Sequence, residues 1–231
     1  MPICNSMVFD DDFEAKSKAL DKRPFVYRFV KRLFDILFSL IVVALCIVLL
    51  PITLTILIAT AASTKGFPIY VQERVGRYGR PLHILKLRTM VADSDDVEKY
   101  LSAEQLTQWK RERKVDDDPR ITKFGALCRK TSIDEMPQFF NVLAGQMSVI
   151  GPRPISADEL EWFGDDAALY LSVSGGITGL WQSGPRNEAS FENGERQKIE
   201  LEYVRTANIG VDSRIFFKTF GAMFGKNSTG R

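Results

Sequence analysis

The sequence has little of the chemistry on which many catalytic sites depend. It contains one histidine, His83, which argues against a histidine-based metal site and against a Ser-His triad. Its three cysteines, Cys4, Cys46 and Cys128, are far apart and have neither a paired nor a metal-binding spacing, so a reducing compartment is expected. Lysine and arginine outnumber the acids by only 31 to 29, so the chain lacks the basic excess of a dedicated nucleic-acid binder.

Charge is absent from one long stretch. The 29 residues 36–64 carry no charged side chain, and a chain of 231 residues does not need an uncharged core helix of that length. The stretch is therefore predicted to lie in a bilayer. A straight helix would measure about 44 Å, against a hydrocarbon core of roughly 30 Å. Pro51 lies near the middle, where it disfavours a straight helix by about 3 kcal/mol and leaves arms of about 22 and 20 Å, each too short to cross alone.

Basic residues flank this stretch on both sides. Because positive charge stays on the cytoplasmic side of a membrane, both flanks are expected there. A helix that enters the inner leaflet, breaks at Pro51 and returns satisfies both flanks, and a single tilted and kinked transmembrane helix is the alternative. The flanking residues are Lys22, Arg23, Arg28, Lys31 and Arg32 before the stretch and Lys65, Arg74, Arg77 and Arg80 after it.

The chain on either side of the membrane segment is expected to fold differently. Residues 1–25 begin polar and acidic, show no signal peptide and predict a flexible N-terminal arm. Residues 26–65 are the basic-flanked re-entrant segment, and residues 66–231 form one cytoplasmic domain. The predicted fold class is α+β, mainly helical, with a re-entrant membrane helix-break-helix and a small cytoplasmic domain that contains a β-hairpin.

The hairpin is predicted over residues 66–90, with Gly76 and Gly79 marking its turn. Alternate residues on its second strand share a face, so Lys86 and Arg88 point the same way, about 7 Å apart. Two cations at this spacing could straddle a phosphate group. An ordinary solvated strand face is the alternative.

Other polar segments have structural interpretations. His83 falls on the strand face of Leu85 and Leu87 and is predicted to be a packed structural histidine. Residues 92–115 predict a polar helical stretch with a solvated, charged face. The acidic cluster Asp116–Asp118 precedes a proline, so it is expected to end a helix and start a turn rather than to bind a divalent metal.

Two adjacent acids, Asp134 and Glu135, stand in an otherwise apolar run. Ser132 followed three residues later by Glu135 fits a helix capping box, which would make both acids structural. Met136 precedes a proline and is expected to avoid helical geometry. Pro137 is favourable at the first position of a following helix, so the acids are expected at a helix entrance, where backbone amides favour negative charge.

Nearby cations give the same two acids a second interpretation. A carboxylate among cations stays ionised, as a nucleophile towards phosphorus must be, and a second carboxylate beside it can hold Mg²⁺ together with phosphate oxygens. Adjacent acids point in different directions, which suits this division of roles and not the facing pair of a glycosidase. Phosphoryl transfer through an aspartyl intermediate is therefore the sharper hypothesis. The cations are Arg129, Lys130 and Arg153, with Lys86 and Arg88 from the hairpin.

Five segments occur in a distinctive order. They read KRLFDILFSL, QERVGRYGRPLHILKLRTM, DDPRITKFGALCRKTSIDEMPQFFNVLAGQMSVIGPRP, GGITGLWQ and LEYVR. In order and spacing they resemble the bacterial sugar transferase family, the monotopic phosphoglycosyl transferases that start exopolysaccharide, capsule and O-antigen synthesis. The resemblance extends over nearly everything after the first 25 residues.

The resemblance implies a ping-pong transfer of a hexose-1-phosphate. Asp134 would attack the β-phosphate of a UDP-sugar, UMP would leave, and polyprenol (undecaprenyl) phosphate would take the phosphosugar from the aspartate. Glu135 matches the Mg²⁺-associated acid of the family's Asp-Glu dyad, so Asp134 and Glu135 are the implied metal ligands. The family's phosphate-binding cations match, by motif position, Lys86, Arg88, Arg129 and Arg153.

Other implied substrate-binding positions match less closely. Gln182 and Arg186 fall in a segment that reads WQSGPR, with Pro185 before the arginine, where the family usually has WQVSGR. Glu200 stands where relatives commonly have aspartate. Both departures concern the nucleotide or sugar end of the site. The further likeness to stand-alone exopolysaccharide initiators implies galactose-1-phosphate first and glucose-1-phosphate second.

The resemblance also implies a location and partners. It implies a re-entrant helix broken at Pro51 in the bacterial inner membrane, with residues 66–231 as the catalytic domain facing the cytoplasm. The implied partners are UDP-hexose, polyprenol phosphate, membrane lipid and downstream glycosyltransferases, with no nucleic acid. Two other functions fit parts of the sequence: a non-catalytic membrane-docked scaffold for glycosyltransferases, and a surface protein whose juxtamembrane bases bind anionic lipid.

Overall fold

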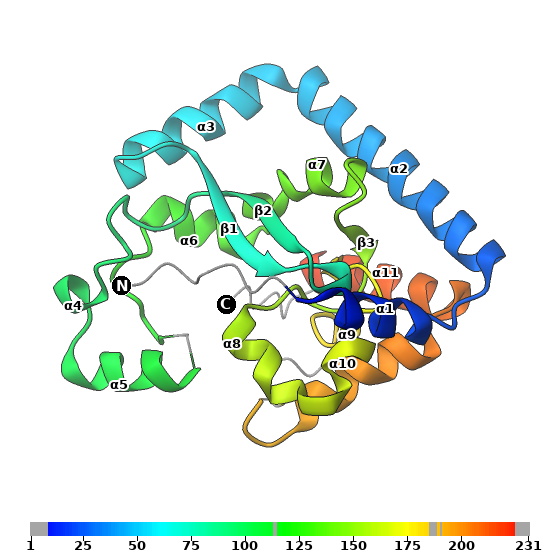
Figure 1. Ribbon diagram of the computed structural model, residues 1–231. Helices are drawn as coiled ribbons and strands as arrows, with labels where there is room; N and C mark the ends of the chain where they lie inside the picture. Colours follow the sequence, from blue (N-terminus) through cyan, green and yellow to red (C-terminus); the bar gives the residue numbers. More distant parts are fainter. Residues whose placement is uncertain (1–8, 113–114, 185–188, 190, 225–231) are drawn as a thin grey trace. The chain divides into compact units, whose positions relative to one another are not determined.

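The computed structural model describes residues 9–112, 115–184, 189 and 191–224 (Figure 1). This part of the chain is mainly helical and contains two small sheets of two strands each. The strands are β1 (Ile69–Val75), β2 (Pro81–Leu87), β3 (Ser148–Ile150) and β4 (Gly176–Thr178). The longer helices are α1 (Asp11–Leu20), α2 (Phe25–Val48), α3 (Leu50–Thr64), α5 (Ala103–Glu112), α6 (Lys123–Lys130), α10 (Glu195–Thr206) and α11 (Ile209–Phe224). The shorter ones are α4 (Val97–Tyr100), α7 (Gln138–Leu143), α8 (Ala157–Leu160), α9 (Ala167–Tyr170), and the 3₁₀ turns η1 (Arg77–Gly79), η2 (Ile133–Glu135) and η3 (Glu161–Asp166).

The chain divides into two compact units. Of the described residues, unit 1 contains those in 9–45, 71–85 and 138–224, and unit 2 contains those in 46–70 and 86–137. The chain therefore enters each unit more than once. As functional segments, the predicted ranges 1–25, 26–65 and 66–231 stay a prediction.

Unit 1 is built around the parallel pair of β3 and β4, in which Ser148 is opposite Gly176 and Ile150 is opposite Thr178. Helix α11 contacts both strands, and α7 contacts β3. A buried apolar cluster lies in the same unit, made of Ile155, Leu160, Phe163, Tyr170, Leu171 and Leu201. This cluster is the part of the core on which the loop after β3 rests, since Ile155 belongs to that loop.

Residues 11–20 form helix α1, although the sequence predicted a flexible arm there. The helix contacts η1 and α9. Ser17 is fully buried, and its hydroxyl donates to the Ala168 carbonyl at 2.8 Å. Glu14 accepts from Arg80 at 2.6 Å. The acidic composition was misleading because one of these acids, Glu14, pairs with a base far along the chain and another, Asp10, caps the helix by accepting from the Phe13 N–H.

The predicted hairpin is confirmed, with β1 and β2 joined through η1. The prediction for His83 is wrong: its side chain is 58% exposed, 3.9 Å from the Glu73 carboxylate. Leu82 and Ile84 are the buried residues at this end of β2, so strand alternation turns His83 outward. Nearer the C-terminal end of the strand the next buried residue is Leu87, three residues after Ile84 and not two, so the inward-facing positions shift along β2.

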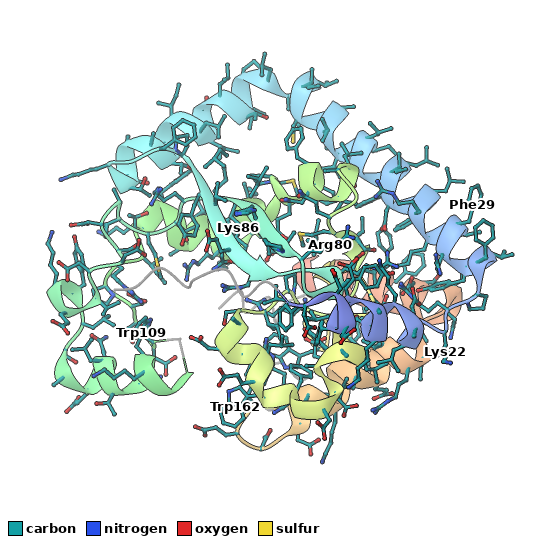
Figure 2. All side chains as sticks on the ribbon, viewed as in Figure 1. Lys22, Phe29, Arg80, Lys86, Trp109 and Trp162 are labelled. Atoms are coloured by element: carbon teal, nitrogen blue, oxygen red, sulfur yellow. The ribbon has the colours of Figure 1, made fainter. Side chains whose placement is uncertain are left out.

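Helices α2 and α3 contain the long uncharged stretch. Among the described residues, no single helix has both the length and the apolar composition to cross a membrane, but α2 and α3 together do, bent by 85° at the break between them. The break falls at Leu49, and Pro51 lies in the first turn of α3, because proline lacks the N–H of a continuous helix and its ring crowds the carbonyl four residues earlier. Phe29 of α2 projects away from the ribbon in Figure 2. Other exposed apolar side chains of the pair are Phe25, Leu37, Leu40, Ile41, Ile47, Leu50, Ile52 and Ile58.

Unit 2 contains α3, α6 and η2, and α6 contacts both of the others. An isolated antiparallel bridge between Met90 and Ile121 joins the end of the hairpin to the start of α6. The predicted polar helical stretch is two helices, α4 and α5, because Leu101 turns inward between them to pack with Val97 and Val115. The predicted turn at Asp116–Asp118 is confirmed.

Candidate functional site

The predicted site residues fall into both units. Unit 2 contains Lys86, Arg88, Arg129, Asp134 and Glu135, and unit 1 contains Arg153, Gln182 and Glu200. Arg186 lies outside the described residues, as does Pro185 before it.

The acidic dyad lies on the single turn η2. Both Asp134 and Glu135 are half-buried. The predicted capping box is wrong: Ser132 has a left-handed φ of 55° and its side chain caps no backbone N–H. A capping residue needs an extended backbone to aim its oxygen back at the helix, so the left-handed turn removes that possibility. Met136 is helical, contrary to the expectation for a residue before proline.

Arg129 is held close to this turn. Its Nε donates to the Thr89 hydroxyl at 2.9 Å. Burial lowers the pKa of the Arg129 guanidinium, and the Asp134 carboxylate is the largest of the charges that oppose the shift. Burial raises the pKa of the Cys128 thiol, and the charge of Asp134 adds to that effect. Asp134 therefore lies within electrostatic reach of both Arg129 and Cys128.

Helix α6 brings Arg129 to this position through a close backbone contact. Thr122 caps the helix by accepting from the Gly125 N–H at 2.9 Å, and its own N–H donates to the Thr89 carbonyl at 3.0 Å. A Cβ on Gly125 would lie 2.0 Å from that carbonyl oxygen. Only glycine allows α6 to lie this close to the segment that carries Thr89.

The two predicted cations of the hairpin lie at the end of β2. Lys86 is half-buried and is labelled in Figure 2. The Nε of Arg88 donates to the Phe67 carbonyl at 3.0 Å, and its guanidinium lies 5.3 Å from the centre of the Tyr70 ring. These contacts fix Arg88 against the start of the hairpin.

In unit 1, Arg153 lies on the loop that leaves β3. Both Glu200 carboxylate oxygens are 3.3 Å from the Arg153 N–H, and the Tyr170 hydroxyl donates to the Arg153 carbonyl. The guanidinium lies 5.7 Å from the centre of the Trp181 ring. The N–H and the carbonyl of Arg153 thus both have hydrogen-bond partners, which fixes the main chain at this residue.

Glu200, predicted to bind substrate, is fully buried. Burial raises its pKa to about 7, and the charge of Arg196 is the largest effect in the other direction. The Oε1 atom of Gln182 is also buried, and no partner is recorded for it among the described residues.

Sequence reasoning missed Arg196. Its guanidinium lies between two rings, 4.1 Å from the centre of Trp181 and 4.0 Å from the centre of Phe191. The signal available in the sequence was the spacing of Arg196 and Glu200, four residues apart on one predicted helix, which places them on one face.

The dyad offers a limited set of metal ligands. In the described part of the chain, no group of three or more histidine, cysteine or acidic side chains gathers in a way that could hold a metal ion. Asp134 and Glu135 supply two adjacent carboxylates. This donor set fits Mg²⁺, which commonly binds through one or two carboxylates plus substrate phosphates and water, and it does not fit a cage built from protein ligands alone.

Comparison with known proteins gives these residues a context. Residues 26–226 match the profile of a family described as bacterial sugar transferase. The UDP-galactose-lipid carrier transferase of Erwinia amylovora is 42% identical over 199 residues, which are 85% of this chain and 40% of that protein. The exopolysaccharide production protein ExoY of Rhizobium meliloti is 37% identical over 196 residues, 84% of each chain. The UDP-glucose:undecaprenyl-phosphate glucose-1-phosphate transferase of Klebsiella pneumoniae is 38% identical over 196 residues, 82% of this chain and 39% of that protein.

The chain belongs to the bacterial sugar transferase family. This confirms the resemblance found in the sequence. The chain spans about 40% of the length of several of these relatives, including the proteins from Erwinia amylovora and Klebsiella pneumoniae.

Proposed function

We propose that this protein transfers a hexose-1-phosphate from a UDP-hexose to polyprenol phosphate and releases UMP. The observation that carries the proposal is the position of Asp134, a half-buried carboxylate on the short turn η2 within electrostatic reach of Arg129, in a member of this family. Relatives named for UDP-galactose and UDP-glucose reactions support the hexose class. Galactose is the first choice and glucose the second, as expected from the sequence.

The transfer proceeds in two balanced steps. A carboxylate oxygen of Asp134 attacks the β-phosphorus of the UDP-hexose, the bond to the oxygen that bridges the two phosphates breaks, and UMP leaves with that electron pair. A phosphosugar-aspartate remains. An oxygen of polyprenol phosphate then attacks the same phosphorus, the bond to Asp134 breaks, and the free carboxylate is restored with polyprenyl-diphosphate hexose as the product.

The cations support these steps by binding phosphate. Guanidinium and ammonium groups stabilise the charge on phosphate oxygens, and arginine can do so with two parallel hydrogen bonds. Glu135, together with Asp134, would hold Mg²⁺, which when bound neutralises phosphate charge. Gln182 and Arg186 are assigned to the nucleotide or sugar end by motif position. The phosphate-binding cations in this proposal are Lys86, Arg88, Arg129 and Arg153.

The proposal includes a membrane location. The bent pair α2–α3 exposes apolar side chains along its length, and basic residues flank it on both sides. A re-entrant segment in the bacterial inner membrane, with the catalytic part on the cytoplasmic face, places both flanks on the side favoured by positive charge. It also brings the enzyme to membrane lipid and to a lipid-linked acceptor, and leaves the product available to downstream glycosyltransferases.

UMP release tests the proposal. Membranes that contain the protein, with polyprenol phosphate and Mg²⁺, are expected to release UMP from UDP-galactose or UDP-glucose in a panel of UDP-sugars. Asp134→Asn should lower this release at least about a thousandfold, because the attacking group is lost. A phosphosugar adduct on Asp134 should be detected by mass spectrometry in the absence of the acceptor.

Asp117→Asn is the matched control. Asp117 is an exposed acid of unit 2 with a left-handed φ of 50°, a conformation that asparagine adopts readily. It should release UMP at the wild-type rate. If Asp134→Asn does the same, Asp134 is not the nucleophile. If the wild type releases no UMP from any UDP-sugar, the non-catalytic scaffold replaces the enzyme.

A further inference from the structure

Unit 1 contains a buried charged cluster that the proposed reaction does not yet use. Glu200 and Arg196 lie one turn apart on α10, and their relative exposures are 0% and 9%. Glu159 of α8 is 3.7 Å from Arg196, measured from its Oε1 to Nη1. The cluster surrounds the loop residue Arg153 and the ring of Trp181.

The cluster fixes the backbone of Arg153 from two helices. Glu200 of α10 accepts from its N–H, with both oxygens at 3.3 Å, and Tyr170 of α9 donates to its carbonyl. With the main chain fixed in this way, the starting point of the arginine side chain is fixed too. Because Glu200 is fully buried, it acts on this loop and not on a ligand in solvent.

A second set of contacts fixes the surface along which the Arg153 side chain lies. The Arg196 guanidinium is sandwiched between Trp181 and Phe191, at 4.1 and 4.0 Å from the ring centres. The Arg153 guanidinium lies near the same Trp181 ring, at 5.7 Å. Two guanidinium groups on one indole are held there by the attraction of cations to an aromatic face.

Arg196 keeps this position at a cost in hydrogen bonding. Its Nε and Nη2 atoms are buried, and no acceptor is recorded for them among the described residues. A buried donor without an acceptor destabilises a fold. The position of Arg196 is therefore better explained by what it holds in place than by its own contribution to stability.

We propose that Glu200 and Arg196 are positioning residues for the sugar-phosphate transfer, Glu200 holding the main chain of Arg153 and Arg196 holding the Trp181 ring against which the Arg153 side chain lies. The inference rests on the proposed function, in which Arg153 binds a phosphate group of the UDP-hexose. Neither residue touches the substrate. They act by fixing the position of Arg153 before the substrate binds.

The hold on Arg153 depends on pH. Burial raises the pKa of Glu200 to about 7, while the charges of Arg196 and Arg153 lower it and that of Glu159 raises it. Burial raises the pKa of Tyr170, the remaining titratable group that faces Glu200, and the charge of Glu200 adds to that effect. An ionised carboxylate accepts an N–H bond about twice as strongly as a neutral acid, so the hold strengthens as the pH rises through about 7. The folded-state pKa of Glu200 is above its unfolded-state value, so its contribution to stability is fully present below the unfolded-state pKa. That contribution is lost as the pH rises through the folded-state pKa of about 7.

Steady-state kinetics of Glu200→Gln test the inference. The expected result is a KM for UDP-hexose about tenfold above that of the wild type at pH 8, with the KM for polyprenol phosphate unchanged, because less binding energy is available at one phosphate. The ratio of wild-type to variant kcat/KM should fall towards one below about pH 6, where both side chains are neutral. Glu200→Asp keeps the charge and should recover most of the lost affinity, and Arg196→Lys, which keeps the charge but not the planar group between the rings, should resemble Glu200→Gln.

Asp212→Asn is the control for a structural effect. Asp212 is another buried acid of unit 1, bonded to Tyr27, Lys31 and Tyr203 and not to Arg153. Loss of folded protein lowers kcat at every pH and leaves KM unchanged, so this variant should show that pattern. If Glu200→Gln shows it as well, Glu200 is a structural residue and the inference is overturned.

Trp181 fluorescence gives a readout that needs no activity. In the full chain with Trp109→Phe and Trp162→Phe, the emission of Trp181 should titrate with a midpoint of about 7 and should be flat in the Glu200→Gln form. Flat emission in the protein that retains Glu200 overturns the link between Glu200 and the ring. If the emission titrates but no UDP-sugar is consumed, the link between Glu200 and the Trp181 ring is supported and the proposed function is wrong.

Discussion

Asp118 shows how one residue of an acidic run can differ from its neighbours. Its side chain is 3% exposed and pairs with Arg120, whose Nη2 is 2.6 Å from the carboxylate. Burial alone would raise its pKa, but the hydrogen bonds and charge of Arg120 outweigh that effect and lower it. The ionised pair therefore stabilises the fold above the unfolded-state pKa of about 3.9, and this contribution is lost as the pH falls through the lower folded-state pKa.

Asp118→Asn should lower the free energy of unfolding by about 3 kcal/mol at pH 7, because Arg120 stays buried without its full counter-charge. The difference from the wild type should shrink below about pH 4. Thermal or denaturant unfolding of the detergent-solubilised chain measures both effects. Asp117→Asn, one residue earlier and exposed, should change stability by less than about 0.5 kcal/mol, and equal stability of the two variants would contradict the assignment.

At the scale of single residues, sequence predicted which charged groups lie near each other better than it predicted backbone geometry. It identified Asp134 and Arg129 as an acid and a base near each other, and Asp134 is the largest opposing charge on Arg129. It failed for Ser132 and His83, because a left-handed backbone and a shift in strand alternation are set by packing that no local pattern records.

At the scale of elements, the packing of α6 requires a glycine at position 125. A Cβ on Gly125 would lie 2.0 Å from the Thr89 oxygen and 2.7 Å from its carbonyl carbon, and both are backbone atoms that cannot swing aside. The last turn of α6 carries Arg129, which is bonded to the side chain of the same Thr89. Displacement of the helix would therefore move Arg129 relative to Thr89.

Gly125→Ala should destabilise the protein by about 3 kcal/mol, as expected for overpacking against fixed atoms. It should also lower UMP release, since Arg129 moves with the helix. The matched variant is Gly221→Ala in α11, where a Cβ would meet no atom within 4 Å. That change should stabilise the protein by about 0.5–1 kcal/mol, because alanine favours a helix over glycine. If both variants change the free energy of unfolding in the same direction, the contact with Thr89 does not restrict the side chain at position 125.

The elements that sequence predicted well are those fixed by local signals. The hairpin has its turn glycines, and the break between α2 and α3 has Pro51. The short helix α9 and the parallel pair of β3 and β4 carry little local signal, and the two strands pair only when distant parts of the chain meet.

At the scale of the whole molecule, the proposed membrane location depends on the bent helix pair. Phe25 is the first residue of the pair and Phe67 follows its last residue, Thr64, and the two side chains are 75% and 72% exposed. A re-entrant segment returns both ends to one side, whereas a kinked transmembrane helix separates them. Single cysteines at these positions therefore distinguish the two topologies.

Phe25→Cys and Phe67→Cys, each made in a chain without Cys4, Cys46 and Cys128, should both react with a membrane-impermeant maleimide in inverted vesicles. Neither should react in intact spheroplasts, because the basic flanks favour the cytoplasm. Labelling after detergent solubilisation controls for reactivity. A position that reacts in intact spheroplasts while the other does not would show that the pair crosses the membrane.

The assignment of the predicted site residues to two units lies beyond sequence reasoning. Arg129 and Asp134 are five residues apart and fall in one unit, but Arg153, which follows in the same motif segment, falls in the other. Spacing along a chain indicates which groups take part in a reaction, but long-range packing decides which of them share a folded unit.

Helix α1 has a consequence for the modular use of this protein. It lies before residue 26, where the family match begins, yet Phe9 and Phe13 at its start pack against the buried cluster of unit 1. A fragment trimmed to the family boundary, or a chimera joined to a foreign N-terminal region there, would uncover that apolar surface and gain a tendency to aggregate. The folded part of unit 1 therefore begins before residue 26, the first residue of the family match.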